Sequence, residues 1–269
     1  MNVRPLLEVH QHLWRDAIAS LWERRHAIVY VTALLWIPWK LAVPLIDGAF
    51  GVRRRLGLPL EWIVDPFYEP FYGAVILVLL ADGPDSDWRK GLFRGLWFLP
   101  RIWLIELKIA VWGLAVPYLV LHIGSAVAVT IWPGSVVARV VLAATVLSMS
   151  WIVVVMLLYL LAPAVMIAEW QAEGWPPWEH SVGAAARERP AGVSTGWVLW
   201  AARQLVRGQM RHAVCVLVVG QIAITFVQML VPPGDHPLVQ VAKGMSMLAT
   251  AVWWALIWQF CGYCVRLAD

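Results

Sequence analysis

The stretch from Val140 to Ala168 contains no charged residue. A transmembrane helix needs about 20 consecutive, mostly apolar residues, so this stretch is long enough to cross a lipid bilayer. Hydrophobic residues make up 61% of the 269 residues and charged residues 14%. Soluble domains contain about 45–50% apolar residues and about 25% charged residues. Because lipid offers the backbone no hydrogen-bonding partner, the sequence predicts an all-α, polytopic transmembrane helical bundle.

Apolar runs divide the chain into six predicted spans within a single membrane domain, residues 1–269. An amphipathic helix at 5–25, with leucines and tryptophans on one side, is expected to lie in the membrane interface. A turn at 82–87 and a short basic helix with Arg89 and Arg94 precede the third span. A Trp- and Pro-rich insert with an amphipathic helix at 197–211 occupies 169–211. The spans are predicted at 27–46, 60–81, 100–122, 138–161, 212–231 and 244–264; a re-entrant pair formed by the first two would leave four.

Basic residues are distributed unequally between the two sides of this topology. With the amino terminus inside, fourteen lysines and arginines lie in inside loops and five in outside loops. Cytoplasmic loops carry an excess of positive charge, so both termini are expected in the cytoplasm, with the chain in a bacterial inner membrane. The triplet Arg53–Arg55 is the exception. No cleavage site precedes the first apolar run, so no secretory signal peptide is expected.

Three carboxylates open the second predicted span. Glu61, Asp65 and Glu69 are four residues apart, so a helix places them on one face. The wholly apolar part, 71–81, would form about 16 Å of helix, which is shorter than a bilayer core of about 30 Å. Glu69 must therefore lie below the interface, where a carboxyl costs about 2–3 kcal/mol and faces protein or water.

Lys40 in the first span and Lys108 in the third are the expected charge partners of these carboxylates. Neutral or paired carboxylates in a membrane bundle could serve proton coupling or cation binding, and Pro66 and Pro70 free backbone carbonyls that could join the site. Alternatively, the carboxylates lie at a shallow, hydrated helix start and pair with lysines only to fix packing. Glu106 and Lys108 are two residues apart, so each is expected to seek a partner on another helix.

A stripe of arginines follows the predicted helix at 197–211. Arg203, Arg207 and Arg211 are four residues apart, and their guanidinium groups suit lipid phosphates or an acidic partner helix. The ordinary excess of positive charge on the cytoplasmic side is the simpler explanation.

Two segments carry a resemblance to a known group. Leu161-Ala-Pro-Ala-Val-Met-Ile-Ala-Glu169, followed by Trp197-Val-Leu-Trp-Ala-Ala-Arg-Gln-Leu-Val-Arg-Gly208, resembles six-helix bacterial membrane proteins that are similar to the membrane domain of glycerophosphodiester phosphodiesterases. The chain departs from that group in the insert at 170–196 and in having alanine, Ala201 or Ala202, at the place of the usual serine. The resemblance implies an all-α membrane fold. It implies no activity, because the chain contains no phosphodiesterase domain.

No G-x-S-x-G, H-E-x-x-H, Walker or G-x-G-x-x-G pattern occurs. Cys261 and Cys264 have C-x-x-C spacing, but at the end of a predicted span they are expected to serve packing, not redox or metal chemistry. His10 and His12 lack a third ligand, so no metal or cofactor is expected. Our first hypothesis is a non-enzymatic subunit that supports assembly or transport by a membrane complex, with the bilayer and other subunits as partners and no nucleic acid. The second is a small proton- or cation-coupled transporter that uses the carboxylates. The third, an intramembrane lipid-modifying enzyme, would use Glu169, Glu173, Glu179 and His180.

Overall fold

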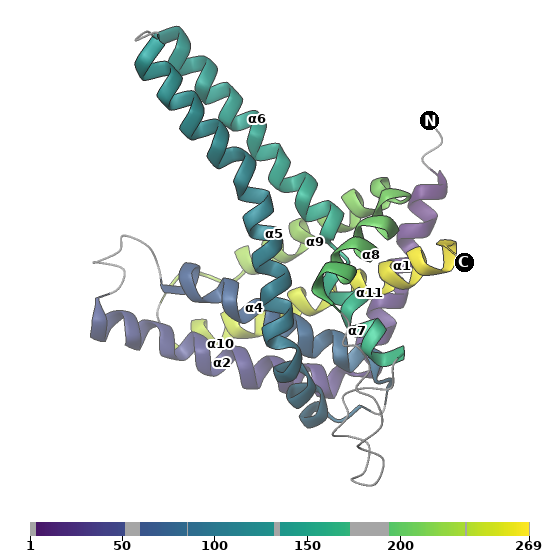
Figure 1. Ribbon diagram of the computed structural model, residues 1–269. Coiled ribbons are helices and arrows are strands. Elements are labelled where there is room, and N and C mark those ends of the chain that lie inside the picture. The colour runs from purple at the N-terminus through teal and green to yellow at the C-terminus, as the bar shows by residue number, and fades with distance from the viewer. Residues whose placement is uncertain are drawn as a thin grey trace, which may run out of the picture.

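The computed structural model describes residues 4–51, 60–84, 86–131, 135–172, 194–234 and 236–268. These residues are almost entirely helical, and no strand occurs among them, which confirms the predicted all-α fold (Figure 1). The helices are α1 (Arg4–Glu23), α2 (Arg25–Phe50), α4 (Leu60–Ala81), α5 (Trp88–Ile131), α6 (Ser135–Tyr159), α7 (Ala162–Ala172), α8 (Thr195–Arg207), α9 (Met210–Met229), α10 (Pro237–Ser246) and α11 (Leu248–Ala268).

Five helical stretches in the described part of the chain are long and apolar enough to cross a membrane, so the protein is a multi-pass membrane protein. They coincide with the first, third, fourth, fifth and sixth predicted spans. The second predicted span is α4, whose apolar part, Tyr68–Ala81, is shorter because three carboxylates interrupt its first half. The five stretches are Arg25–Phe50, Trp88–Gly124, Arg139–Ala172, Met210–Met229 and Pro237–Leu267.

Several boundaries differ from the predicted ones. The short basic helix and the third span, expected to be separate, are one helix, α5, with Pro100 inside it. The fourth predicted span, 138–161, agrees with α6, but the uncharged run 140–168 divides into α6 and α7 at Leu160 and Leu161. The division lies just before Pro163, whose nitrogen cannot donate to the carbonyl four residues earlier. The predicted helix at 197–211 is also divided: α8 ends at Arg207, and Arg211 lies in the first turn of α9.

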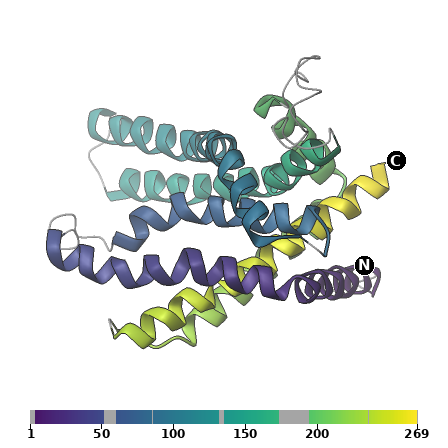
Figure 2. The same ribbon diagram turned by 90° about the horizontal axis from the view of Figure 1, so that it is seen from below.

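Helix α4 runs antiparallel to α2. Arg24, just before α2, donates to the Leu79 carbonyl near the end of α4 (3.0 Å), whereas Lys40, deep in α2, contacts Asp65 near the beginning of α4 (2.7 Å). Residue numbers therefore rise along α2 as they fall along α4. Both termini lie at the end of the molecule where α4 finishes, and the joined ends of α5 and α6 lie at the opposite end (Figures 1 and 2).

The second half of α4 forms the centre of the fold. All residues from Pro70 to Ala81 are buried, and α4 packs against α5, α11, α2 and α7. Helix α5 approaches it through two glycines four residues apart. A Cβ at Gly91 would lie 2.5 Å from Leu79 Cδ2, and one at Gly95 would lie 2.4 Å from Val75 Cγ2. Small residues at this spacing let membrane helices approach closely.

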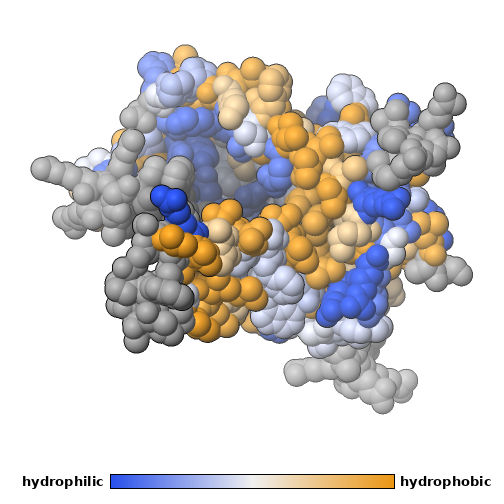
Figure 3. All heavy atoms as spheres, turned by 90° about the horizontal axis from the view of Figure 1, so that it is seen from above, coloured by the Kyte–Doolittle hydropathy of each residue, from blue (hydrophilic) through white to orange (hydrophobic). Residues whose placement is uncertain are grey.

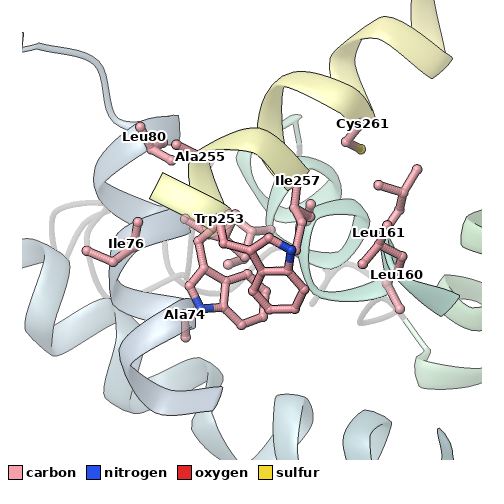
Figure 4. Packing of buried hydrophobic residues seen from close by; sticks show 14 of the residues in the cluster. Ala74, Ile76, Leu80, Leu160, Leu161, Trp253, Ala255, Ile257 and Cys261 are labelled. Atoms are coloured by element: carbon pink, nitrogen blue, oxygen red, sulfur yellow. The ribbon is translucent and has the colours of Figure 1, made fainter. Parts of the chain in front are cut away.

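Two neighbouring tryptophans of α11 use glycines in the same way. A Cβ at Gly73 of α4 would lie 2.3 Å from the Trp254 ring, and one at Gly220 of α9 would lie 2.2 Å from the Trp253 ring. Helix α11 is thereby held against α4 on one side and α9 on the other. Figure 4 shows Trp253 in this core, with Ala74 of α4 on one side and the bend between α6 and α7 on the other.

Side chains from two other segments bind the carboxyl-terminal carbonyls of α4. The Arg24 Nε donates to the carbonyls of Leu79 and Gly83, both at 3.0 Å. Gln171 Nε2 of α7 donates to the Ala81 carbonyl at 2.6 Å. Arg24 is buried, and burial lowers the pKa of its guanidinium, although the Glu23 carboxylate beside it acts in the opposite direction; arginine stays charged in proteins.

The outer parts of α5 and α6 form a hairpin that projects from the bundle (Figure 1). Its side chains are apolar and exposed, among them Tyr118 (60%) and Leu147 (73%). In a membrane protein, apolar side chains left outside the bundle face lipid. The hairpin is therefore a lipid-facing part of the molecule.

We predict that Gly95→Leu destabilises the protein by about 1–3 kcal/mol, the usual cost of overpacking, because the new side chain would displace Val75 of α4. The midpoint of thermal unfolding in detergent measures the effect. The matched control is Gly48→Leu, since Gly48 of α2 has no atom within 4 Å of a new Cβ. Equal midpoints for the two variants would contradict the close packing of α4 and α5.

Candidate intramembrane carboxylate site

Lys40 of α2 joins two carboxylates of α4. Its Nζ lies 2.7 Å from Asp65 Oδ2 and 3.8 Å from Glu61 Oε1. The second oxygen of Asp65 accepts a hydrogen bond from Trp39 Nε1 at 2.8 Å. The sequence predicted Lys40 as a charge partner of these carboxylates, and in the structure Lys40 lies beside both Asp65 and Glu61.

This cluster is buried on the lysine side only. The Lys40 side chain is 7% exposed, against 26% for Glu61 and 28% for Asp65. Lys40 also lies over the Trp36 ring, 5.5 Å from its centre, which adds a cation–π attraction. One cation facing two carboxylates leaves the cluster with an excess of acidic groups. A buried lysine is thus fixed beside a half-buried acidic pair.

Glu69 lies one helical turn further along α4, about halfway along this helix. It is half-buried, and the charges of Asp65 and Lys40 act on it. No hydrogen bond or ion pair joins it to any residue that the structure describes. Glu69 is therefore a membrane-depth carboxyl that forms no ion pair with Lys40, which contacts Asp65 and Glu61 instead.

Glu106 of α5 is the second such carboxyl. It is half-buried, lies close enough to Glu69 for electrostatic interaction, and has no hydrogen bond or ion pair within the described part of the chain. It borders a cavity of about 70 Å³ between α5, α6, α9 and α11, together with Tyr159, Trp253 and Trp254. A cavity needs only about 10–15 Å³ to hold a water molecule, so this one has room for several.

The surface of the molecule is hollowed on one face. Seen from above, hydrophilic residues gather in this hollow, and apolar residues form its rims (Figure 3). Polar side chains in such a hollow are open to water.

The structure separates Lys108 from the carboxylates, contrary to the sequence prediction. Lys108 Nζ donates to Thr195 Oγ1 of α8 at 2.6 Å. Lys108 is two residues after Glu106, so the helix turns the two side chains to different faces. Lys108 connects α5 to α8, while Glu106 remains near Glu69.

Sequence reasoning missed a line of hydroxyl groups beside Glu69. The Tyr68 hydroxyl donates to the Leu35 carbonyl at 3.1 Å. The Tyr72 hydroxyl lies 2.7 Å from Thr32 Oγ1, and Thr32 Oγ1 donates to the Ile28 carbonyl at 2.7 Å. The spacing of Tyr68 and Tyr72, one residue before and three after Glu69, was the available signal. These contacts fix the α2–α4 pair around Glu69.

The predicted arginine stripe lies on two helices. Arg203 and Arg207 are exposed on α8, and Arg211 is exposed at the start of α9. The buried side of α8 consists of Val198, Leu199, Ala202 and Val206, whereas Trp197 and Trp200 are exposed. The three arginines thus remain available at the end of the molecule that carries both termini.

Some residues singled out in the sequence lie outside the part of the chain that the structure describes. They are Glu173, Glu179, His180 and the Arg53–Arg55 triplet. His10 contacts His212 of α9, with 3.4 Å between Nε2 and Nδ1, and burial together with His212 lowers the pKa of His10.

No protein-family model, no curated protein and no solved structure matches this chain.

We predict that Lys40→Gln destabilises the protein by about 1–3 kcal/mol, because it leaves Asp65 without its cation. The double variant Lys40→Gln/Asp65→Asn should recover at least half of this loss. Denaturant titration followed by tryptophan fluorescence measures all three proteins. Arg15→Gln is the matched control, since Arg15 pairs with Asp16 at the surface, with side chains 70% and 52% exposed, where such pairs contribute little. If Lys40→Gln behaves like Arg15→Gln, the cluster does not stabilise the α2–α4 pair.

Proposed function

We propose that this chain moves protons or cations across the bilayer, with Glu69 and Glu106 as the groups that take them up and release them. The observation that carries this proposal is the pair itself. Two half-buried carboxyls on adjacent helices are close enough to interact electrostatically, and no described residue forms an ion pair with either of them. Sequence reasoning placed a subunit role first, but it could not place Glu106 beside Glu69.

Electrostatics explains why such a pair suits transport. Two nearby carboxylates repel each other, and a low-dielectric surrounding strengthens the repulsion. A proton or a cation held between them relieves it. Because each carboxyl lacks a fixed partner, the bound ion can leave without the breaking of a structural ion pair.

Polar groups and a cavity on either side of Glu69 and Glu106 would give the transported ion a route to and from this pair. Glu61 and Asp65 extend the line of carboxyls from Glu69 toward the beginning of α4. The cavity beside Glu106 extends it toward α11. A proton or cation would pass from the acidic end of α4 to Glu69, then to Glu106, and then to water in the cavity.

We also propose that the chain lies in the cytoplasmic membrane of a bacterium with both termini in the cytoplasm. The end of the molecule that carries the termini also carries most of the described arginines, whereas Arg139 and Lys243 lie toward the other end. An excess of positive charge marks the cytoplasmic side of a membrane protein. Neither transport nor this location requires an enzymatic step.

We predict that Glu69→Gln and Glu106→Gln each lower ion flux by about tenfold or more, because an amide cannot exchange a proton. The purified protein is reconstituted in liposomes that contain a pH-sensitive dye, and a potassium diffusion potential drives proton entry. Sodium and potassium gradients test cation flux in the same vesicles. The double variant should be no slower than either single variant, since residues that act as a unit are not additive.

Glu8→Gln, at an exposed carboxylate of α1, is the matched control and should leave flux unchanged. If Glu69→Gln leaves both flux and its pH dependence intact, the transport proposal is wrong.

A second function, a non-enzymatic subunit of a membrane complex, is favoured by a different observation. Helix α8 exposes Trp197 (42%) and Trp200 (58%) on the same short helix as Arg203 and Arg207. Aromatic residues and arginine are enriched at protein interfaces, and this combination suits an acidic partner.

We predict that, under this second function, gentle extraction into native nanodiscs recovers a stoichiometric partner identified by mass spectrometry. Trp197→Ala/Trp200→Ala should reduce its recovery severalfold. Trp112→Ala, which alters an exposed tryptophan of the lipid-facing hairpin (49%), is the control and should not. Recovery of the chain alone would contradict the subunit role.

A further inference from the structure

An apolar groove runs along α11, with α1 on one side and α9 on the other. Two adjacent pockets of about 210 and 390 Å³ make up the groove, and both are lined by Ile18, Leu248 and Val252. We refer to this feature as the α11 groove. Trp253 lines both this groove and the cavity beside Glu106, and none of the carboxylates lines the groove.

The floor and walls of the α11 groove follow from helical spacing. Leu248, Val252 and Leu256 are four residues apart, so they form one continuous apolar strip on α11. The α9 wall contains small residues, Gly220 and Ala223, because the Trp253 ring lies directly on Gly220. These small residues leave space between α1 and α9 where larger side chains would close the groove.

Contacts outside the groove hold its two walls in place. Gln259 Nε2 of α11 donates to Ser20 Oγ of α1 at 2.9 Å. His10 of α1 contacts His212 of α9 near the terminal end of the molecule. The walls are therefore tied together by polar contacts, and the groove between them remains apolar.

Arg25 is the one charged residue among the described residues that line the groove. Its guanidinium lies 5.1 Å from the centre of the Trp22 ring, and Nη1 donates to the Trp22 carbonyl at 3.1 Å. No described carboxylate pairs with it. Arg24, the residue before it, is buried against α4, whereas Arg25 is exposed. A guanidinium with unused donors thus lies where the first membrane helix begins.

We propose that the α11 groove binds an anionic glycerophospholipid, with an acyl chain along Leu248, Val252 and Leu256 and the phosphate at Arg25. Phosphate accepts paired hydrogen bonds from a guanidinium. Trp14 and Trp22 flank the groove on α1, and tryptophan favours the depth of lipid headgroups. The positive charge at the start of α2 and the apolar strip beside it match the two parts of one lipid molecule.

The test measures lipid retained by the purified full chain in detergent, using native mass spectrometry. The probes are dioleoylphosphatidylglycerol and, as a lipid without net charge, dioleoylphosphatidylcholine. The chain should retain the anionic lipid preferentially. Arg25→Gln should lower that retention about fivefold, the effect of one basic residue at a lipid surface, and leave the neutral lipid unchanged. Ala223→Phe should lower retention of both lipids by filling the groove.

Two variants serve as matched controls. Arg89 stacks on Trp88 at 5.4 Å as Arg25 does on Trp22, but outside the groove, so Arg89→Gln should have no effect. Ala115→Phe adds the same side chain as Ala223→Phe at an exposed position of α5 and should also have none. Equal losses for Arg25→Gln and Arg89→Gln would overturn the proposal in favour of unspecific surface binding.

Crosslinking keeps the proposal testable should Ala223→Phe fail to fold. A photoreactive benzoylphenylalanine replaces Ile18, which is 53% exposed and lines both pockets. The protein is kept in detergent and supplied with an equimolar amount of phosphatidylglycerol, so that no bulk phospholipid surrounds the hairpin. Lipid adducts should be several times more abundant than at Leu119, an equally exposed residue of the hairpin (54%). Equal labelling, or displacement of the phospholipid by free oleate alone, would overturn the proposal.

Discussion

The cationic cap on the carboxyl-terminal end of α4 is the interaction on which the arrangement of the bundle depends. The last four carbonyls of any helix lack partners within the helix, and water cannot supply them in the interior of a membrane protein. Arg24 and Gln171 supply donors instead. A positive charge at a helix carboxyl terminus is also favoured by the helix dipole. Two segments far apart in sequence are thereby fixed to one helix end.

The contacts at the carboxyl-terminal end of α4 also determine which residues of α2 lie opposite its amino-terminal half. Since α4 runs antiparallel to α2 from Arg24 onward, the register of the pair is set, and Lys40 lies opposite Asp65 and not a turn away from it. The glycine contacts of α5 and α11 then enclose the apolar half of α4. The acidic half is left outside this packing, and Glu69 there lies close enough to Glu106 of α5 for electrostatic interaction. The apolar half of α4 therefore serves packing, whereas its acidic half contributes Glu61, Asp65 and Glu69 to the candidate site.

The helical fold could be read from the sequence because apolar runs of this length have few alternatives, and the predicted bounds 60–81 agree with α4. The Lys40–Asp65 contact was predictable because a buried charge must find an opposite one. The proximity of Glu69 and Glu106 was not, since it depends on how α4 and α5 cross. Gly91 and Gly95 carried that information through their four-residue spacing, but the partners of small residues cannot be read from one sequence. Lys108 was misplaced because Thr195, its partner, is 87 residues away.

The antiparallel pairing of α2 and α4 has a consequence for how the chain enters a membrane. Alone, α2 would carry an unpaired lysine into lipid and α4 would carry three carboxylates, each at a cost of about 2–3 kcal/mol on insertion scales. Together, the lysine and Asp65 neutralise each other. The two helices are therefore best suited to leave the insertion machinery as one hairpin. Helix α2 would remain at the protein-lined exit of the insertion machinery until residues 60–81 have been synthesised. The earliest step in biogenesis would then be the pairing of α2 with α4.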